Sequence, residues 1–311
     1  MVKREYSYPS KSGLCNIHAR SWLPDTPEQI KGVFQITHGM AEIGDRYADF
    51  ARYLTENGFA VYCNDHLGHG KSVKSDSDLG FFGSENGWDS FVEDARTLTQ
   101  IAKNENQGKP FVFFGHSMGS FVAREYASRY ADDSDISAYI FCGTSGKNPA
   151  APLGLKLTQA VAKLKGERYR SKLIDKIAFG TYNSKIENNR TSFDWLTRDE
   201  EIVNYYIASN YCGFLFTVSG FKDMFTVLNR VSQKDWYSSL SKTTPILLVA
   251  GTADPVGNYG KGVEQVYSDI KNAGCNATLK LFDDARHEIL NEINRAEVYE
   301  YIRNWICSVI K

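Results

Sequence analysis

The chain has 311 residues, of which 42% are hydrophobic and 23% charged, and its formal net charge is −1. This composition is ordinary for a globular protein and excludes disordered, collagen-like and coiled-coil chains. Basic and acidic residues are balanced at 36 and 37, so we expect neither nucleic acid as a partner nor a general attraction to anionic membranes. A chain of this length can bury a core that needs no disulfide or metal.

Cysteine spacing and hydropathy both bear on where the protein resides. The six cysteines are scattered singly, without a CxxC pair, which predicts reduced thiols. The charged N-terminus is not followed by the apolar stretch of a secretory signal, and no apolar run is long enough to span a membrane. We therefore expect a cytoplasmic protein.

Short apolar strands alternate with amphipathic helices through most of the chain. Strands are expected at residues 15–19, 33–36, 59–63, 111–114, 138–142, 246–250 and 277–281. Helices are expected between and after them, at about residues 47–54, 91–102, 117–130, 263–270 and 298–309. This alternation predicts an α/β fold with a mostly parallel central sheet, helices on both faces, and ligands bound at the carboxyl ends of the strands.

Between residues 145 and 231 the strands stop and only helical patterns remain. The segment is rich in aromatic residues, and its helices are expected at about residues 153–165, 171–179, 199–209 and 214–228. An all-helical insertion between two strands of one sheet is best placed as a cap over the edge of that sheet. We therefore expect a core of residues 1–144 and 232–311 and a helical cap, or lid, of residues 145–231. The aromatic side chains fill the cap's own core or line an apolar pocket beneath it.

The segment Gly115-His116-Ser117-Met118-Gly119 matches the pattern GxSxG and stands between an expected strand and an expected helix. In such an elbow the central residue takes a strained backbone conformation, and the flanking glycines let strand and helix pass closely. The Ser117 hydroxyl would then project above the sheet, over the N-terminus of the helix. We interpret Ser117 as a nucleophile, the alternative being a serine that only caps the helix.

A serine hydroxyl becomes a nucleophile when a neighbouring base removes its proton. His287 follows the last expected strand and Asp254 follows the strand before it, so both are expected at the same sheet edge as Ser117. The order Ser117, Asp254, His287 is that of an α/β-hydrolase triad. The alternatives are a surface histidine in a loop and a turn aspartate before a proline.

An oxyanion formed at a substrate carbonyl needs two backbone N–H donors. Met118, the residue after the nucleophile, is expected to supply one of them. The other is expected from the loop after an earlier strand, His38-Gly39-Met40, where Gly39 permits a sharp turn and the Met40 N–H is the candidate.

The segment Asp65-His66-Leu67-Gly68-His69-Gly70-Lys71-Ser72 invites a metal interpretation because it holds an aspartate and two histidines. No further ligand cluster supports that interpretation, so a structural loop near the active site is expected instead. Neither a GxGxxG dinucleotide fingerprint nor a phosphate-binding lysine motif is present. We expect no cofactor and no metal.

Together these motifs resemble the monoacylglycerol lipase and lysophospholipase branch of the α/β-hydrolases, which is grouped with serine aminopeptidases of type S33. The matching segments are His38-Gly39-Met40 with Arg46-Tyr47, Asp65 to Ser72, Gly115 to Gly119, Gly251-Thr252-Ala253-Asp254-Pro255-Val256, and Arg286-His287-Glu288 with Asn291-Glu292. The family pattern after the third strand is usually HGxGEH, and Ala41 and Ile43 depart from it here.

The resemblance implies a serine hydrolase that cleaves carboxylic esters of long acyl chains through an acyl-enzyme, under a cap that forms the acyl tunnel. Monoacylglycerols and lysophospholipids are the substrates it implies, and the cap could touch a membrane surface transiently. The alternative is an esterase, thioesterase or aminopeptidase that acts on small or aryl acyl substrates. A catalytically silent α/β-hydrolase used as a scaffold is a third reading, against which the presence of all three triad residues argues.

Overall fold

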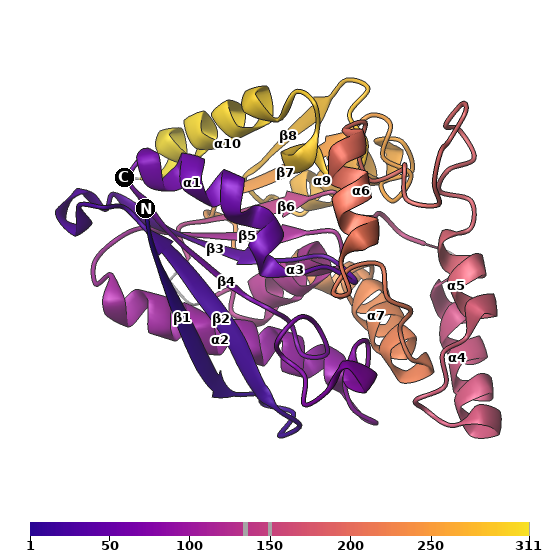
Figure 1. Cartoon of the computed structure of the whole chain (residues 1–311). Helices are drawn as coiled ribbons and strands as arrows, with labels where there is room; N and C mark the ends of the chain where they lie inside the picture. Colours follow the sequence, from indigo (N-terminus) through magenta and orange to yellow (C-terminus); the bar gives the residue numbers. More distant parts are fainter. Residues whose placement is uncertain (133–135, 149–150, 311) are drawn as a thin grey trace.

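The computed structural model describes residues 1–132, 136–148 and 151–310. Residues 133–135 and 311 of the expected core, and residues 149–150 of the expected cap, lie outside the described residues. Within the described part, eight strands form one sheet in the order β1-β2-β4-β3-β5-β6-β7-β8, with helices on both faces (Figure 1). This arrangement confirms the α/β class expected from the sequence.

The direction of the strands determines where a ligand can bind. The strands are β1 (Val2–Pro9), β2 (Asn16–Leu23), β3 (Gly32–Thr37), β4 (Phe59–Asn64), β5 (Phe111–His116), β6 (Ala138–Cys142), β7 (Ile246–Gly251) and β8 (Ala277–Phe282). The pairs β1–β2 and β2–β4 are antiparallel, whereas β4, β3 and β5 to β8 run parallel to one another. The carboxyl ends of the parallel strands therefore meet at one edge, where α/β proteins bind their ligands.

The sequence pattern does not predict β1, which forms one border of the sheet. Most of its side chains are exposed and only Tyr8 is buried, so the alternation that marks a half-buried strand is missing. Antiparallel pairing with β2 positions the strand instead, from Val2 opposite Leu23 to Pro9 opposite Asn16. The charged side chains of β1 also protect this exposed border from pairing with another chain.

Helices cover both faces of the sheet and its carboxyl edge. Those of the core are α1 (Ala48–Glu56), α2 (Gly87–Glu105), α3 (Met118–Arg129), α9 (Lys261–Asn272) and α10 (Arg295–Val309). Those between β6 and β7 in the chain are α4 (Ala151–Lys165), α5 (Lys172–Phe179), α6 (Glu200–Ala208), α7 (Val218–Arg230) and the short α8 (Lys234–Ser239), of which α8 is not predicted by the sequence pattern.

Two hydrophobic clusters lie on opposite faces of the sheet because neighbouring residues of a strand point to opposite sides. On β5, Val112 and Phe114 belong to the cluster that includes α1 and α10. Phe111 and Phe113 belong to the cluster that includes α2, α3 and α9. Both faces are thus covered, which explains why the parallel strands read as continuous apolar runs in the sequence.

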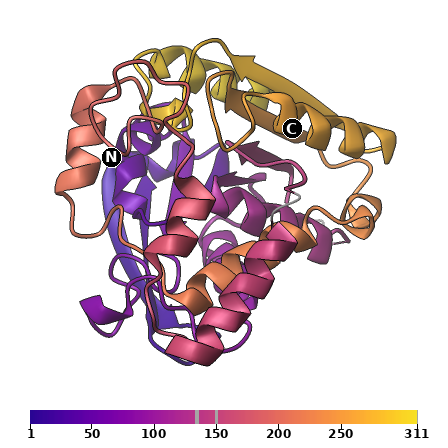
Figure 2. The same ribbon diagram turned by 90° about the vertical axis from the view of Figure 1, so that its right-hand side faces the viewer.

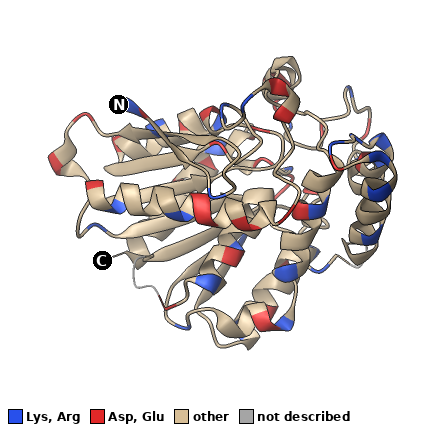
Figure 3. Cartoon of the chain, turned by 90° about the horizontal axis from the view of Figure 1, so that it is seen from below, with Lys and Arg blue, Asp and Glu red and all other residues tan. Residues whose placement is uncertain are grey.

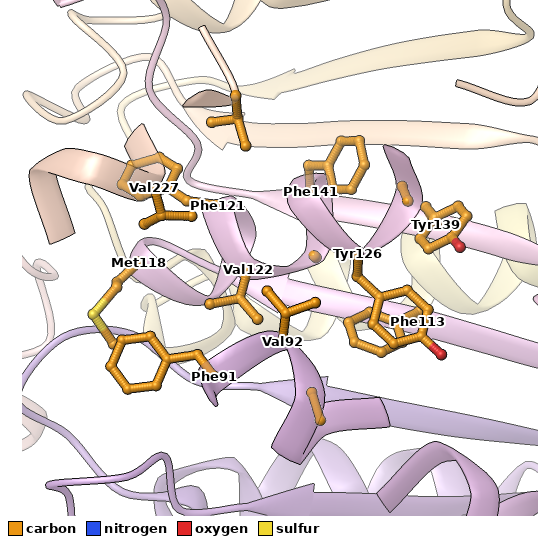
Figure 4. Packing of buried hydrophobic residues seen from close by; sticks show 14 of the residues in the cluster. Phe91, Val92, Phe113, Met118, Phe121, Val122, Tyr126, Tyr139, Phe141 and Val227 are labelled. Atoms are coloured by element: carbon orange, nitrogen blue, oxygen red, sulfur yellow. The ribbon is translucent and has the colours of Figure 1, made fainter. Parts of the chain in front are cut away.

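Helix α3 is packed between the sheet, α2 and α7 (Figure 4). The Tyr126 ring of α3 lies 4.4 Å from the Phe113 ring of β5. Phe121 and Val122 point into the same cluster as Val227 of α7. This packing fixes the N-terminus of α3, where the GxSxG motif lies.

Helix α7 begins later than its apolar spacing predicts, at Val218 instead of Phe214. The Thr217 hydroxyl accepts a backbone hydrogen bond of 3.1 Å from the first turn and so caps the helix. Phe214 and Phe216 therefore lie outside the helix, with their ring centroids each 5.3 Å from the His69 ring.

The segment from α4 to α7 lies against the carboxyl edge of the sheet (Figures 1 and 2). The Tyr206 hydroxyl donates to the Ala41 carbonyl in the loop after β3 at 3.0 Å, and the Thr217 hydroxyl donates to the Gly80 carbonyl in the loop after β4 at 2.8 Å. We use the name cap segment for residues 145–231, whose division from the core stays a prediction. Of the helices in the described ranges, none combines the length and apolar character needed to cross a membrane.

Candidate active site

Ser117 occupies a sharp turn between β5, which ends at His116, and α3, which begins at Met118. Its backbone has a φ of 53° and a ψ of −121°, which a residue other than glycine rarely adopts. The flanking glycines are in tight surroundings: a Cβ at Gly119 would lie 2.1 Å from a backbone oxygen of β3, and one at Gly115 would lie 2.2 Å from the Gly119 oxygen. The turn therefore has the strained geometry that GxSxG predicts, and such strain is concentrated at functional sites.

His287 and Asp254 meet in the interior, each in a loop that follows a strand. Nδ1 of His287 lies 3.0 Å from Oδ1 of Asp254, and the two side chains are 2% and 0% exposed. A carboxylate only accepts, so Nδ1–H donates to Asp254 and Nε2 of the neutral ring is left as an acceptor. Burial disfavours the charged imidazole, but the Asp254 carboxylate outweighs it and raises the pKa of His287 above its ordinary value.

His116, the residue before Ser117, contacts this pair. The ring centroids of His116 and His287 are 4.7 Å apart. A Cβ at Gly39 would lie 3.2 Å from Ser117 Cβ and 3.3 Å from the His116 ring, so the loop after β3 also reaches the turn. Among the described residues, Ser117 Oγ makes no hydrogen bond with the His287 ring. Hydrogen bonds of this kind are often long without substrate and tighten in the substrate complex.

The loop after β3 brings Gly39 against Ser117, and the next residue in the chain carries the Met40 N–H. The Gly39 N–H donates to the Glu42 carboxylate, and the Gly39 carbonyl accepts a hydrogen bond of 2.8 Å from Nδ1 of His38. Because a peptide unit is planar and trans, the bond to the Gly39 carbonyl also sets the direction of the Met40 N–H. No acceptor among the described residues pairs with that N–H.

The second expected donor is the N–H of Met118. Met118 is the first residue of α3, so its N–H has no acceptor within the helix. The N–H groups of Met40 and Met118 are therefore both available beside Ser117. Their function as an oxyanion hole stays a prediction.

Three buried histidines support the loop after β3. His66 N–H donates to Nε2 of His38 at 2.9 Å, so His38 carries its proton on Nδ1. His69 accepts the Ala41 N–H on Nε2 at 3.2 Å and donates from Nδ1 to a carbonyl of its own loop. Burial lowers the pKa of all three, to about 3 for His69, so the rings are neutral. No group of three or more His, Cys, Asp or Glu side chains in the described ranges is placed to hold a metal ion.

A buried network of ion pairs lies next to the site, and the sequence patterns assign it no role. Both terminal nitrogens of Arg46 donate to the Glu288 carboxylate at 2.6 Å, and Arg46 also pairs with Glu42. Burial favours the neutral acid, but Arg46 outweighs it and lowers the pKa of Glu288 to about 2. The signal present in the sequence is the pair Glu42 and Arg46, four residues apart and directly after the loop His38-Gly39-Met40.

Cap-segment residues between α5 and α6 cover His287. The Trp195 ring lies 5.1 Å from the His287 ring, and the Tyr182 ring lies 4.9 Å from that of Trp195. The backbone is bound as well, since the Glu288 N–H donates to the Leu196 carbonyl at 2.7 Å. The Trp195 ring therefore packs against the imidazole, which is buried from water.

The strand order, the turn at Ser117 and the histidine after the last strand define an α/β-hydrolase. The family model described as serine aminopeptidase, S33, matches residues 28–294. The chain belongs to this family.

Named relatives agree with this assignment. The monoacylglycerol lipase of Mycolicibacterium smegmatis is 29% identical over 99% of this chain and 98% of its own length. The monoglyceride lipase of Homo sapiens is 26% identical over 93% of this chain and 86% of its own length. A carboxyl esterase from Bacillus coagulans, solved in complex with glycerol, matches 99% of both chains at 29% identity with a TM-score of 0.92. The chain is thus a carboxylic ester hydrolase of the monoacylglycerol lipase-like group, and its substrates are small-molecule esters.

Proposed function

We propose that the protein hydrolyses esters with a long acyl chain, of the monoacylglycerol or lysophospholipid type, through Ser117, His287 and Asp254. The observation that carries this proposal is the 3.0 Å contact of His287 Nδ1 with Asp254 Oδ1, beside the strained turn at Ser117. A carboxylate that orients an imidazole, next to a serine on a sharp turn, is the set of groups that nucleophilic acyl transfer needs.

In the proposed reaction, Ser117 Oγ attacks the ester carbonyl while Nε2 of His287 takes its proton. Asp254 keeps Nδ1 protonated and stabilises the imidazolium that forms. The N–H groups of Met40 and Met118 bind the oxyanion, and loss of one such donor typically lowers the rate by about 10²–10³. His287 then protonates the leaving alcohol and activates the water that releases the acid from the acyl-enzyme.

Labelling with a fluorophosphonate, followed by ester hydrolysis assays, tests this mechanism. The wild-type protein is expected to be labelled and active, whereas Ser117→Ala folds but is neither labelled nor active. Ser128→Ala, on the same helix and away from the turn, is the matched control and keeps both properties. Near-normal turnover by Ser117→Ala would contradict the assignment.

The long acyl chain is supported by a row of rings that leads to the imidazole. The centroids of Phe179 and Tyr182 are 5.4 Å apart, and Trp195 follows before His287. Aromatic walls with few polar groups are typical of sites that bury an apolar ligand. For p-nitrophenyl esters from acetate to palmitate, kcat/KM is expected to rise with chain length; the highest kcat/KM for acetate would restrict the substrates to small acyl groups.

Glycerol as the alcohol is supported by the relatives named as monoacylglycerol lipases and by the esterase bound to glycerol. Monoacylglycerol and lysophosphatidylcholine with the same acyl chain separate the two headgroups. We expect faster release of fatty acid from monoacylglycerol. The reverse order would make lysophospholipids the substrates.

The surface of α4 and α5 supports transient contact of the cap segment with a membrane. Leu153, Leu164, Leu173 and Ile177 are between 58% and 81% exposed. Residues 151–180 carry seven Lys or Arg against two Asp or Glu, and basic positions mark the helices at the right-hand edge of Figure 3. Apolar side chains beside basic ones favour lipid interfaces. We therefore expect the protein to float with anionic vesicles, and the Leu164→Ser variant to do so less.

The alternative is an aminopeptidase, which the description of the family favours, or an esterase or thioesterase that acts on small or aryl acyl substrates. The same three side chains would serve that chemistry. Amino acid p-nitroanilides and short thioesters, assayed beside monoacylglycerol, decide between these candidates.

A cytoplasmic location, expected from the unpaired cysteines, is part of our proposal as well.

A further inference from the structure

Ala41, the residue after the proposed oxyanion donor Met40, is held from two sides. Its φ of 50° lies in the left-handed region, which alanine adopts only when the surroundings impose it. The Ala41 N–H donates to Nε2 of His69 at 3.2 Å. The Ala41 carbonyl accepts hydrogen bonds from the Tyr206 hydroxyl at 3.0 Å and from the Gly213 N–H at 2.9 Å.

These partners come from different parts of the chain. His69 lies in the loop after β4, stacked 5.5 Å from the Phe82 ring. Tyr206 lies on α6 in the cap segment, where its ring is 5.1 Å from the Phe193 ring and 4.9 Å from the Arg46 guanidinium. Core and cap segment thus bind the same residue, and the packing of both aromatic groups leaves them little freedom to move.

Three successive peptide units are each fixed by a side chain. His38 binds the unit that carries the Met40 N–H, His69 binds the next, and Tyr206 binds the carbonyl of the third. Because each unit is planar, these bonds together determine the backbone angles of Met40 and Ala41. Without the Tyr206 hydroxyl, only the Gly213 N–H still binds the Ala41 carbonyl, so the strained Ala41 can relax and the Met40 N–H is held less firmly.

We infer that docking of the cap segment sets the oxyanion hole, with Tyr206 and His69 as positioning residues that act through Ala41 on the Met40 N–H. This inference rests on the proposed function of Ser117 and Met40. It extends the proposed function, because the segment that would cover the acyl chain also completes the site of the reaction. A cap segment that moves to admit substrate must return before the donor is in place, which is induced fit.

Tyr206→Phe tests the inference because it removes only the hydroxyl and keeps the ring. We expect kcat to fall roughly tenfold on both p-nitrophenyl acetate and octanoate with KM nearly unchanged, less than the loss of a whole oxyanion donor. Tyr205→Phe on the same helix, 57% exposed, is the matched control and keeps wild-type kcat.

The acetyl ester separates positioning from pocket lining, since it does not reach along an acyl pocket. A rise in KM confined to the octanoyl ester would overturn the inference, and so would equal kcat values in Tyr206→Phe and Tyr205→Phe. If the wild-type protein and Tyr205→Phe hydrolyse no ester, it is the proposed function that fails.

His69 provides a second, independent comparison at the other side of Ala41. His69→Gln retains an acceptor for the Ala41 N–H, whereas His69→Leu does not. We expect the glutamine variant to keep more kcat on the acetyl ester than the leucine variant at equal Tm. Equal kcat values in these two variants would overturn the positioning role of His69, whatever the stability of Tyr206→Phe.

Discussion

Arg46 and Glu288, 242 residues apart in the sequence, form a bidentate ion pair with both contacts at 2.6 Å. Glu288 directly follows His287, the proposed base. Arg46 also pairs with Glu42, whose carboxylate binds the Gly39 N–H in the loop after β3. The pair therefore connects the loop after β8 to the loop after β3.

Removal of Arg46 should be costly because two buried carboxylates lose their cation. We expect Arg46→Met to lower the free energy of unfolding by about 3–5 kcal/mol, as for other broken buried pairs. Arg52→Met is the control, since Arg52 and Asp49 are 58% and 71% exposed, and such surface pairs contribute at most about 1 kcal/mol. Urea unfolding measures both, and equal midpoints would contradict a structural role for the network.

The pH dependence of hydrolysis follows from the His287–Asp254 contact. A protonated His287 cannot take the Ser117 proton, so activity is present above the pKa of His287 and lost below it. Since the carboxylate raises that pKa, the acid limb of kcat/KM is expected to have its midpoint above about 6.5, the ordinary histidine value. Asp254→Asn removes the raising charge, so its midpoint moves to lower pH while kcat falls by up to about 10⁴.

Acid release measured by pH-stat titration gives this profile without the pH-dependent absorbance of p-nitrophenol. Substrate stability is checked without enzyme at each pH. A profile that stays flat well below the ordinary histidine pKa would exclude His287 as the base. An Asp254→Asn midpoint above that of the wild-type protein would contradict the effect of the Asp254 charge on the His287 pKa.

The sequence predicts the fold and the reacting groups because their signals are local. The turn at Ser117 follows from glycine spacing between a strand and a helix, and both are present as expected. Asp254 and His287 were identified from their positions after two strands, and parallel strands bring such positions to one edge. The contact between them is then a consequence of topology.

The remaining parts of the site depend on long-range packing that no local pattern encodes. The ion pair of Arg46 with Glu288 joins loops whose approach depends on the whole sheet. Trp195 is one of many aromatic residues in the cap segment, and only tertiary structure shows that its ring covers His287. The predicted start of α7 is wrong because Phe214 has helical spacing, whereas the Thr217 cap makes the helix begin only at Val218.

Backbone strain at Ser117 gives a stability prediction that is separate from catalysis. A side chain on a residue at φ 53° and ψ −121° lowers the free energy of unfolding by about 1–3 kcal/mol, whereas glycine adopts such angles freely. Ser117→Gly is therefore expected to unfold at a higher urea concentration than Ser117→Ala, although glycine normally lowers stability through chain entropy. Both variants lack the Ser117 hydroxyl, so the difference between their stabilities reports on the backbone. A less stable glycine variant would mean that the turn is not strained.

Arg124 connects α3 to both ends of the cap segment. Its Nη1 donates to the Ser145 carbonyl at 2.8 Å and its Nη2 donates to the Val231 carbonyl at 2.6 Å. These are the residues at which the sequence pattern predicts the cap to begin and end. The guanidinium lies 4.5 Å from the Trp236 ring, and burial lowers the pKa of Arg124 to about 10, so it stays charged at neutral pH.

Arg124→Met removes both carbonyl hydrogen bonds and a third to Thr144 Oγ1, while the methionine thioether still packs on Trp236. Each buried carbonyl left unpaired costs about 1–3 kcal/mol, and every 1.4 kcal/mol of local stability corresponds to about a tenfold change in amide exchange. We therefore expect exchange near residues 145 and 231 to accelerate tenfold or more, with β5 unchanged. Arg129→Met, on the same helix but paired with Asp89 and Glu93, should leave both ends protected. Equal acceleration in β5 would instead indicate global destabilisation, and Arg124 would then stabilise the core as a whole instead of anchoring the cap segment.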